Sequence, residues 1–227
     1  MHSLLVLMDE MLAKKEHAAT SPVIRMVTIW LGANDAILPT EPGAVPLNEF
    51  TSNLNAMLVA LTSASSPYAA ADTPLSIILI TPGPCWPGMF EPDTGRDEWC
   101  IPENMKMYRD AVLKVGAEWK MKEEADPRSP KWMIETVDAW GDLVNAAGGE
   151  GEGLRPYFTD GIHFSSKGYS VLWEGIAKVI QTKFAGRGLD WEVERDLPKR
   201  VPASEDVDWK RPQSVIEGMK LPKFRLA

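Results

Sequence analysis

Apolar positions recur every three or four residues in four segments of the chain, the spacing typical of helices that bury one face. These segments run from about residue 4 to 15, 47 to 61, 105 to 119 and 169 to 180. Three other segments are apolar or β-branched at almost every position, as strands of a parallel sheet are when both faces are buried. They cover residues 23–31, 75–80 and, with a weaker pattern, 133–140.

The expected order is helix, strand, helix, strand, helix, strand, loop and helix, which favours the α/β class with helices on both faces of a parallel sheet. The loop is the acidic and Gly-rich stretch that ends at Gly153, and Ser165 or Ser166 is the expected N-cap of the last helix. From Gly186 onward the periodicity fades into mixed charges and prolines. We therefore expect one domain over residues 1–185 and a docked extension over 186–227.

The composition excludes several classes of function. A net charge of −8 and a pI near 5.0, with no basic cluster, argue against nucleic acid as a partner. No segment is long and apolar enough to span a bilayer, and the apolar run near the N-terminus is too short for a signal peptide. We expect a cytoplasmic protein.

The chain has two cysteines, Cys85 and Cys100, which are too few for a disulfide framework or a four-ligand zinc site. They flank a loop with Pro and Gly, so a single bridge remains open, but the lack of a secretion signal favours a reduced pair. The same loop carries Trp86, Phe90 and Trp99. These aromatic residues could shape a binding pocket or pack on the surface, and the sequence does not decide between the two.

Asp160 and His163 are the first candidate catalytic residues. They lie three residues apart on an expected loop before the last helix. A carboxylate that accepts a hydrogen bond from Nδ1 orients an imidazole and stabilises its protonated form, as a general base for a hydroxyl requires. The alternative is a loop pair with capping and packing roles. A metal site built on this pair would lack further ligands.

The second candidate is Asn34, in the Gly32-Ala-Asn-Asp35 segment at the end of the first expected strand. Its amide could act as an oxyanion-hole donor, aimed from a strand end at the charge of a tetrahedral intermediate. The alternative is a turn in which Asn34 and Asp35 bond their own backbone. Both candidates fall at the carboxyl edge of the expected sheet, where open α/β sheets form ligand sites.

The segments GAND and DGIHFSSKGY resemble the third and fifth sequence blocks of the SGNH (GDSL) hydrolases, and the strand end ILITPGP resembles the isoamyl acetate-hydrolysing esterase branch. The resemblance spans about residues 4–184. It implies a three-layer α/β/α, flavodoxin-like parallel sheet and hydrolysis of small, acetate-like esters without cofactor or metal. It also implies Asn34 as oxyanion-hole residue and Asp160 and His163 as triad acid and base.

The nucleophile of that family belongs to a Gly-Asp-Ser block, which this sequence does not contain. We therefore expect a chain that starts inside the family domain and lacks its first two strands. Ser3, Ser21, Ser165 and Ser166 do not stand in the Gly-rich strand-to-helix context that exposes a nucleophile. No nucleophile is identified, and loss of a triad serine lowers kcat about a millionfold in a model protease.

Two functions follow as alternatives. In the first, the chain belongs to an ester hydrolase but is inactive as it stands, with a small-molecule ester as its partner. In the second, it is a non-enzymatic binding or interaction protein derived from the esterase fold. In either case the strand over 23–31 is expected to be an exposed apolar edge, which favours self-association.

Overall fold

A computed structural model of the chain describes residues 8–38, 43–90, 101–128, 132–196, 205, 207–211 and 213–219. The chain divides into two compact units, Met1–Phe184 and Ala185–Ala227. All residues predicted to form a site fall in the first unit. Of the residues named in the sequence analysis, Cys100 and Trp99 lie outside the described residues.

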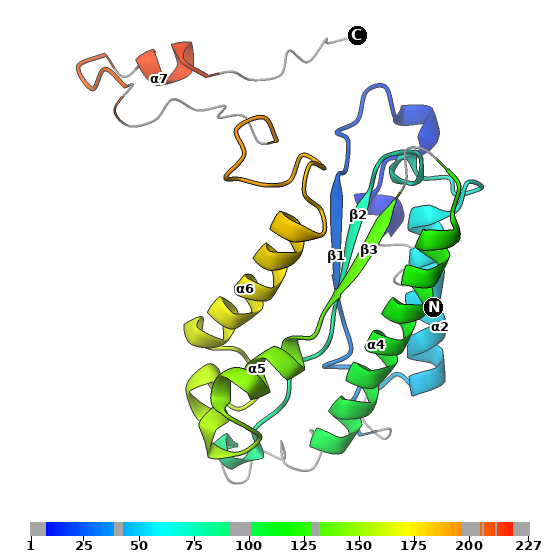
Figure 1. The fold of residues 1–227 in the computed structure, drawn as a ribbon, viewed down its shortest axis with the longest axis vertical. Coiled ribbons are helices and arrows are strands. Elements are labelled where there is room, and N and C mark those ends of the chain that lie inside the picture. Colours follow the sequence, from blue (N-terminus) through cyan, green and yellow to red (C-terminus); the bar gives the residue numbers. More distant parts are fainter. Residues whose placement is uncertain are drawn as a thin grey trace. The chain divides into compact units, whose positions relative to one another are not determined.

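The first unit is built on a parallel sheet in the order β1-β2-β3 (Figure 1). Its strands are β1 (Met26–Trp30), β2 (Ser76–Ile80) and β3 (Met133–Val137). The register pairs Met26 with Ser76 and Ser76 with Met133, so the three strands begin and end together. The parallel sheet confirms the α/β class that the alternating pattern predicts.

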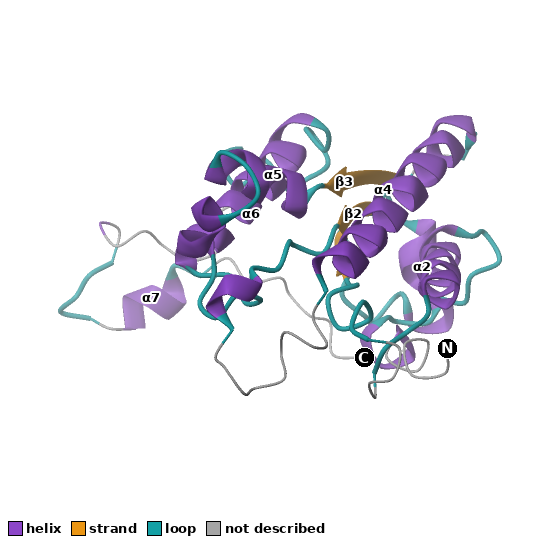
Figure 2. Ribbon diagram, turned by 90° about the horizontal axis from the view of Figure 1, so that it is seen from below, coloured by secondary structure: helices purple, strands orange, loops and turns teal. Residues whose placement is uncertain are grey.

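Helices cover both faces of this sheet, as the two ribbon views agree (Figures 1 and 2). The helices α2 (Leu47–Thr62) and α4 (Pro102–Ala125) pack together on one side, and α5 (Ala139–Ala147) and α6 (Ser166–Thr182) pack together on the other. Short 3-10 turns occupy the connections, at η1 (Lys15–His17), η2 (Ala69–Asp72), η3 (Pro87–Met89) and η4 (Glu152–Tyr157). The arrangement is the three-layer α/β/α architecture.

The central strand β2 is buried along its whole length, because both of its faces carry apolar side chains. Ile77 and Leu79 belong to the core that also contains Leu54 and Leu58 of α2 and Val112 of α4. Since side chains alternate along a strand, Ile78 and Ile80 point to the opposite face, towards the α6 layer. The periodic patterns in the sequence thus correspond to real buried faces.

Several expectations about element boundaries are wrong. The first strand covers Met26–Trp30 rather than 23–31. The third strand ends at Val137 rather than Trp140, and the expected loop after it contains α5. The cause is local capping: the Asp138 side chain accepts a hydrogen bond from the Gly141 N–H at the N-terminus of α5, and Gly148 ends the helix with a φ of 78°. The first helix, expected to reach Lys15, is helical only over 8–11 in the described residues.

At the outer edge of β3, one backbone N–H is bonded by a buried carboxylate. Glu123 of α4 is 5% exposed and accepts hydrogen bonds from the Ile134 N–H at 3.1 Å and from Lys120 Nζ at 2.8 Å. Lys120 also contacts Glu135 at 2.8 Å. A buried charge that satisfies a strand N–H is one of the devices by which natural sheets protect an edge.

The outer edge of β1 has no such cover among the described residues. The Arg25 carbonyl accepts from the Ser76 N–H, so the alternate residues Met26, Thr28 and Trp30 turn their backbone groups away from β2. Beside this edge runs an apolar groove of about 510 Å³, lined by both faces of β1 and by Met8, Met11, Met57 and Leu61. The predicted exposed edge over 23–31 is therefore present in the fold.

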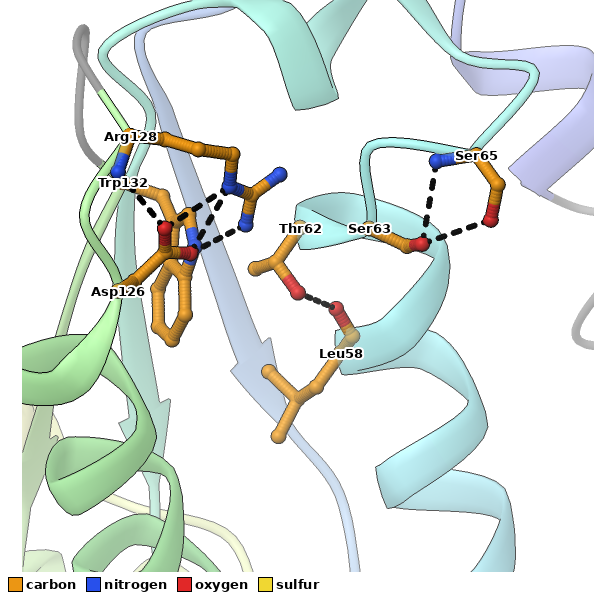
Figure 3. A network of polar contacts seen from close by, with 7 residues as sticks. All are labelled: Leu58, Thr62, Ser63, Ser65, Asp126, Arg128 and Trp132. Carbon is orange, nitrogen blue, oxygen red and sulfur yellow. Dashed lines mark hydrogen bonds and ion pairs between the residues drawn. The ribbon is translucent and has the colours of Figure 1, made fainter.

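The amino-terminal edge of the sheet is fixed by polar contacts (Figure 3). Asp126, which follows α4, accepts from the Arg128 guanidinium and from Trp132 Nε1 just before β3. The hydrogen bonds from Arg128 hold the pKa of the Asp126 carboxyl well below its usual range. At the end of α2, the Thr62 hydroxyl donates to the Leu58 carbonyl at 2.7 Å. The Asp126–Trp132 contact ties the end of α4 to the start of β3, at the edge opposite the predicted site, whereas the Thr62 bond lies within the last turn of α2.

The second unit contains a short helix, α7 (Gln213–Glu217). Within this unit the Gly188 N–H donates to Asp196 at 3.1 Å, and Arg211 forms ion pairs with Asp208 and Glu217.

Candidate active site

Asn34 lies on a tight turn at the carboxyl end of β1. The turn requires glycine at position 32. Its φ is 113°, and a Cβ added there would lie 3.3 Å from the Pro82 ring. The Asp35 carboxylate folds back and accepts from the Gly32 N–H at 3.0 Å. Burial raises the pKa of the Asp35 carboxyl, and hydrogen bonds from the backbone N–H groups of Gly32 and Asp35 oppose that rise.

The two side chains of this turn therefore differ in their roles. Asp35 bonds the turn's own backbone, as in the structural reading of the motif. The Asn34 side chain is exposed and makes no hydrogen bond within the described part of the chain. Its amide is thus available to a ligand, which the functional reading of the motif requires.

Asp160 and His163 form a hydrogen-bonded pair before α6. His163 Nδ1 lies 2.9 Å from Asp160 Oδ2, while Asp160 Oδ1 accepts from the N–H groups of Ile162 at 3.1 Å and His163 at 2.9 Å. Burial acts to raise the pKa of the Asp160 carboxyl, but these hydrogen bonds outweigh it and hold the pKa well below the usual range.

The direction of the hydrogen bond between Asp160 and His163 follows from this ionisation. Because Asp160 is ionised and can only accept, Nδ1 of His163 carries the hydrogen, and Nε2 remains as the acceptor in the neutral ring. The His163 side chain is 75% exposed, so Nε2 is accessible from outside. This is the protonation geometry of a general base that is oriented by a carboxylate.

An aromatic wall stands beside the pair. The Phe164 ring lies 5.5 Å from the Trp30 ring and 5.7 Å from the Tyr169 ring, between centroids. Trp30 Nε1 donates to the Thr81 carbonyl at 3.1 Å, which fixes the indole across the end of β2. Phe164 packs so closely on Gly83 that a Cβ there would lie 2.5 Å from the ring. Gly83 is therefore required for this wall to form.

One cavity of about 230 Å³ brings these residues together, with Trp30, Asn34, Gly83, His163, Phe164 and Tyr169 among its lining residues. Asn34 comes from the loop after β1, Gly83 from the loop after β2, and His163 from the loop before α6. Asn34 and His163, which are 129 residues apart in the numbering, thus share one site. Sequence reasoning missed Trp30, Gly83 and Tyr169, although an aromatic at a strand end and a Gly between two prolines were the available signals.

The described residues that line this cavity include no serine, threonine or cysteine. Ser165 is the N-cap of α6, as predicted: its hydroxyl donates to the Pro156 carbonyl at 2.7 Å and accepts from the Gly168 N–H at 3.3 Å. Ser21 precedes β1 at the opposite edge of the sheet, and Ser3 lies outside the described residues. The site thus has a base and an amide donor, and the described residues that line it include no serine, threonine or cysteine to serve as nucleophile.

The aromatic loop after β2 is described up to Phe90. Cys85 is buried, and Trp86 and Phe90 lie against Gly161, in the turn between Asp160 and His163. Neither ring is among those lining the cavity. In its described part this loop packs against the turn between Asp160 and His163, outside the cavity.

No group of three or more His, Cys, Asp or Glu side chains among the described residues is placed to hold a metal ion. Over the same residues, no helix has the length and apolar character needed to cross a membrane.

Comparison with known proteins identifies the family. The GDSL-like lipase/acylhydrolase family matches residues 5–176, and the chain belongs to that family. The resemblance read from the GAND and DGIH segments is thus confirmed. The match covers the whole sheet and both halves of the cavity.

Named relatives point to one branch. The isoamyl acetate-hydrolyzing esterase of Saccharomyces cerevisiae is 31% identical over 163 residues, which cover 70% of this chain and 58% of the yeast protein. The isoamyl acetate-hydrolyzing esterase 1 homolog of Bos taurus is 27% identical, covering 91% and 71%. A GDSL esterase/lipase of Arabidopsis thaliana is 30% identical, covering 87% and 72%.

The chain therefore spans a little over half the length of the yeast relative. Among solved structures, the lipase/acylhydrolase from Enterococcus faecalis matches with a TM-score of 0.47 and 23% identity, covering 70% of this chain and 62% of that one.

The low pKa of Asp160 predicts a pH-dependent stability difference between the wild type and Asp160→Asn. Folding lowers the pKa of this carboxyl below its value of about 4 in the unfolded chain. The ionised Asp160 therefore stabilises the fold fully above about pH 4, and this contribution is lost as the pH falls towards the pKa of the folded state. Urea unfolding should show a difference of about 1–2 kcal/mol at pH 5. The difference should shrink progressively below about pH 4.

Glu124→Gln, which removes the charge of an exposed carboxylate in α4, is the matched control. An Asp160→Asn difference that stays equal at pH 5 and at pH 3 would contradict the assignment of an ionised, hydrogen-bonded Asp160.

Proposed function

We propose that this chain carries the acid–base and oxyanion-binding part of a Ser-Asp-His ester hydrolase that acts on small, acetate-like carboxylic esters. The observation that carries the proposal is the single cavity lined by both Asn34 and His163. Membership of the GDSL-like family and the names of the yeast and bovine relatives support the same reaction class.

Asp160, His163 and Asn34 each have a role in that reaction. Asp160 fixes the His163 ring with Nδ1–H towards the carboxylate, so Nε2 can take the proton from an attacking hydroxyl and then deliver it to the departing alcohol oxygen. The Asn34 amide donates to the carbonyl oxygen as it gains negative charge in the tetrahedral intermediate. A single amide donor of this kind contributes about 3–4 kcal/mol to transition-state stabilisation in a model protease.

The size and lining of the cavity support small substrates. At about 230 Å³ it is smaller than the roughly 300–1,000 Å³ of sites for drug-sized ligands. Trp30, Phe164 and Tyr169 offer apolar surface for a short alkyl group, while the two polar groups, Asn34 and His163, address the ester itself.

The chain as given lacks the nucleophile of this reaction. No Gly-Asp-Ser occurs in the sequence, and the described cavity residues contain no hydroxyl or thiol of the required type. Removal of the serine alone from a model triad lowers kcat by about a millionfold. We therefore propose that this chain by itself is catalytically inactive.

Fluorophosphonate labelling of the purified chain tests this proposal, together with hydrolysis of p-nitrophenyl acetate. We expect no labelled serine, and a hydrolysis rate that matches that of His163→Ala, because an activated hydroxyl is needed for both. Circular dichroism establishes that the protein assayed is folded. Labelling of a single serine that is lost in His163→Ala would show that the chain has its own nucleophile and would overturn the inactive assignment.

The alternative is a non-enzymatic binding or interaction protein. The open edge of β1 favours it, since a β3 N–H is bonded by Glu123 but β1 is flanked by an apolar groove. Large side chains there are exposed, including Met11 at 75% and Trp30 at 39%. We propose a second copy of this chain as the occupant, paired through β1 in antiparallel fashion, because a twofold interface needs only the same edge on both copies.

Thr28→Lys should weaken this self-association. Thr28 is exposed at the middle of β1, and a charge on an edge strand opposes pairing with another edge. Light scattering coupled to size exclusion should find dimers or larger species for the wild type and for the nearly isosteric control Thr28→Val, but mainly monomers for Thr28→Lys. A wild-type chain that is monomeric at every accessible concentration would refute this interface.

A further inference from the structure

The turn between Asp160 and His163 is attached to the segment that follows β2. The Trp86 N–H donates to the Gly161 carbonyl at 2.7 Å. Pro87–Met89 then forms the 3-10 turn η3, which brings the Phe90 ring over the same glycine. This contact joins two loops that are 75 residues apart in the numbering, Trp86 to Gly161, and it lies outside the cavity.

Gly161 has two independent reasons to be glycine. Its φ of 91° is a conformation that side chains with a Cβ adopt rarely. A Cβ at this position would also lie 2.4 Å from the Trp86 carbonyl oxygen and 2.8 Å from the Phe90 ring. The first contact is with backbone, so it cannot be relieved by rotating a side chain.

The backbone pressed against Trp86 is also the backbone that binds Asp160. The N–H groups of Ile162 and His163, which come directly after Gly161, donate to the Asp160 carboxylate. A displacement of the Gly161 peptide therefore moves the groups that set the carboxylate, and through Asp160 it moves the His163 ring.

The other side of this contact is rigid. Thr81 at the end of β2 is fully buried and donates to Asp138, and Pro82, Pro84 and Cys85 are buried as well. Segment 81–86 is thus a fixed extension of the central strand, and Gly83 and Pro84 within it line the cavity. The Trp86–Gly161 hydrogen bond and the packing of Phe90 on Gly161, together called the clasp, hold the Asp160–His163 turn at a fixed place relative to the cavity wall.

We propose that Gly161 is a positioning residue, which seats the Asp160–His163 turn on the Trp86–Phe90 segment and so fixes the orientation and tautomer of His163. The assignment of His163 as the base rests on the proposed function, but the positioning itself does not require turnover. It is therefore testable in a chain without a nucleophile.

Gly161→Ala is the test variant, and Gly148→Ala is its matched control. Gly148 ends α5 with a φ of 78°, close to that of Gly161, but a Cβ there would meet nothing within 4 Å. Both variants carry the cost of an alanine in a left-handed conformation. Only Gly161→Ala also breaks the approach to Trp86.

The readout is the nitrogen spectrum of the protein labelled with ¹⁵N-histidine, in which Nδ1 and Nε2 report the tautomer directly. His163 is assigned by its loss in His163→Gln, which separates it from His2 and His17. We expect one dominant form, Nδ1–H, in the wild type and in Gly148→Ala, and a loss of that preference in Gly161→Ala, towards the spectrum of Asp160→Asn.

Phe90→Ala provides a second variant, since it loosens the same clasp without adding strain, and it decides the question if Gly161→Ala does not fold. Its His163 signals should move in the same direction by a smaller amount. Folded Gly161→Ala, or folded Phe90→Ala in its place, with wild-type His163 signals would overturn the positioning role. Neither result depends on whether the chain labels with fluorophosphonate, so failure of the proposed function is distinguished separately.

Discussion

The parallel direction of the three strands is the constraint on which the site depends. Because β1, β2 and β3 run the same way and in register, the loops that leave them emerge at one edge. Asn34 follows β1 and Gly83 follows β2, while the segment after β3 returns through α5 to present His163. The sheet thus brings together polar groups that no local interaction would unite.

The same sheet has two unequal edges, and the difference bears on what the chain can do. At β3 a buried Glu123 satisfies a strand N–H and is itself neutralised by Lys120. At β1 the strand is apolar on both faces, as strands inside parallel sheets are, yet it borders a groove. That groove and the candidate active site share Trp30 and Leu31 in their linings. Anything that pairs with β1 would therefore end beside the candidate active site.

Much of this fold could be predicted from the sequence, because its periodic patterns reflect faces that are buried. The stripes of α2, α4 and α6 and the apolar run of β2 have the expected places. The α5 helix could not be found by the same means, because its nine residues are too few for an apolar repeat to stand out, and its start is set by the Asp138 cap. Asp138 also pairs with Arg109 of α4, a tertiary contact that leaves no local signal.

The candidate catalytic residues could be predicted from the sequence, but the residues that enclose the cavity could not. Asp160 and His163 are three residues apart, so their hydrogen bond follows from local geometry, and the end of a strand indicated Asn34. The enclosure of the cavity by Trp30, Phe164 and Tyr169 depends on contacts between β1 and the α6 region. The need for glycine at 83 and 161 arises from close approaches of distant segments, which no spacing in the sequence encodes.

The central claim is that Asn34 and His163 contact the same bound ester molecule. The most direct measurement is a titration of the folded chain with isoamyl acetate, followed by NMR of the Asn34 side-chain amide and the His163 ring nitrogens. Both sets of signals should shift together along one binding curve, and Asn34→Ala should weaken the response of His163. If the ester perturbs only the β1 groove, or shifts one of the two residues without the other, the two do not form one site.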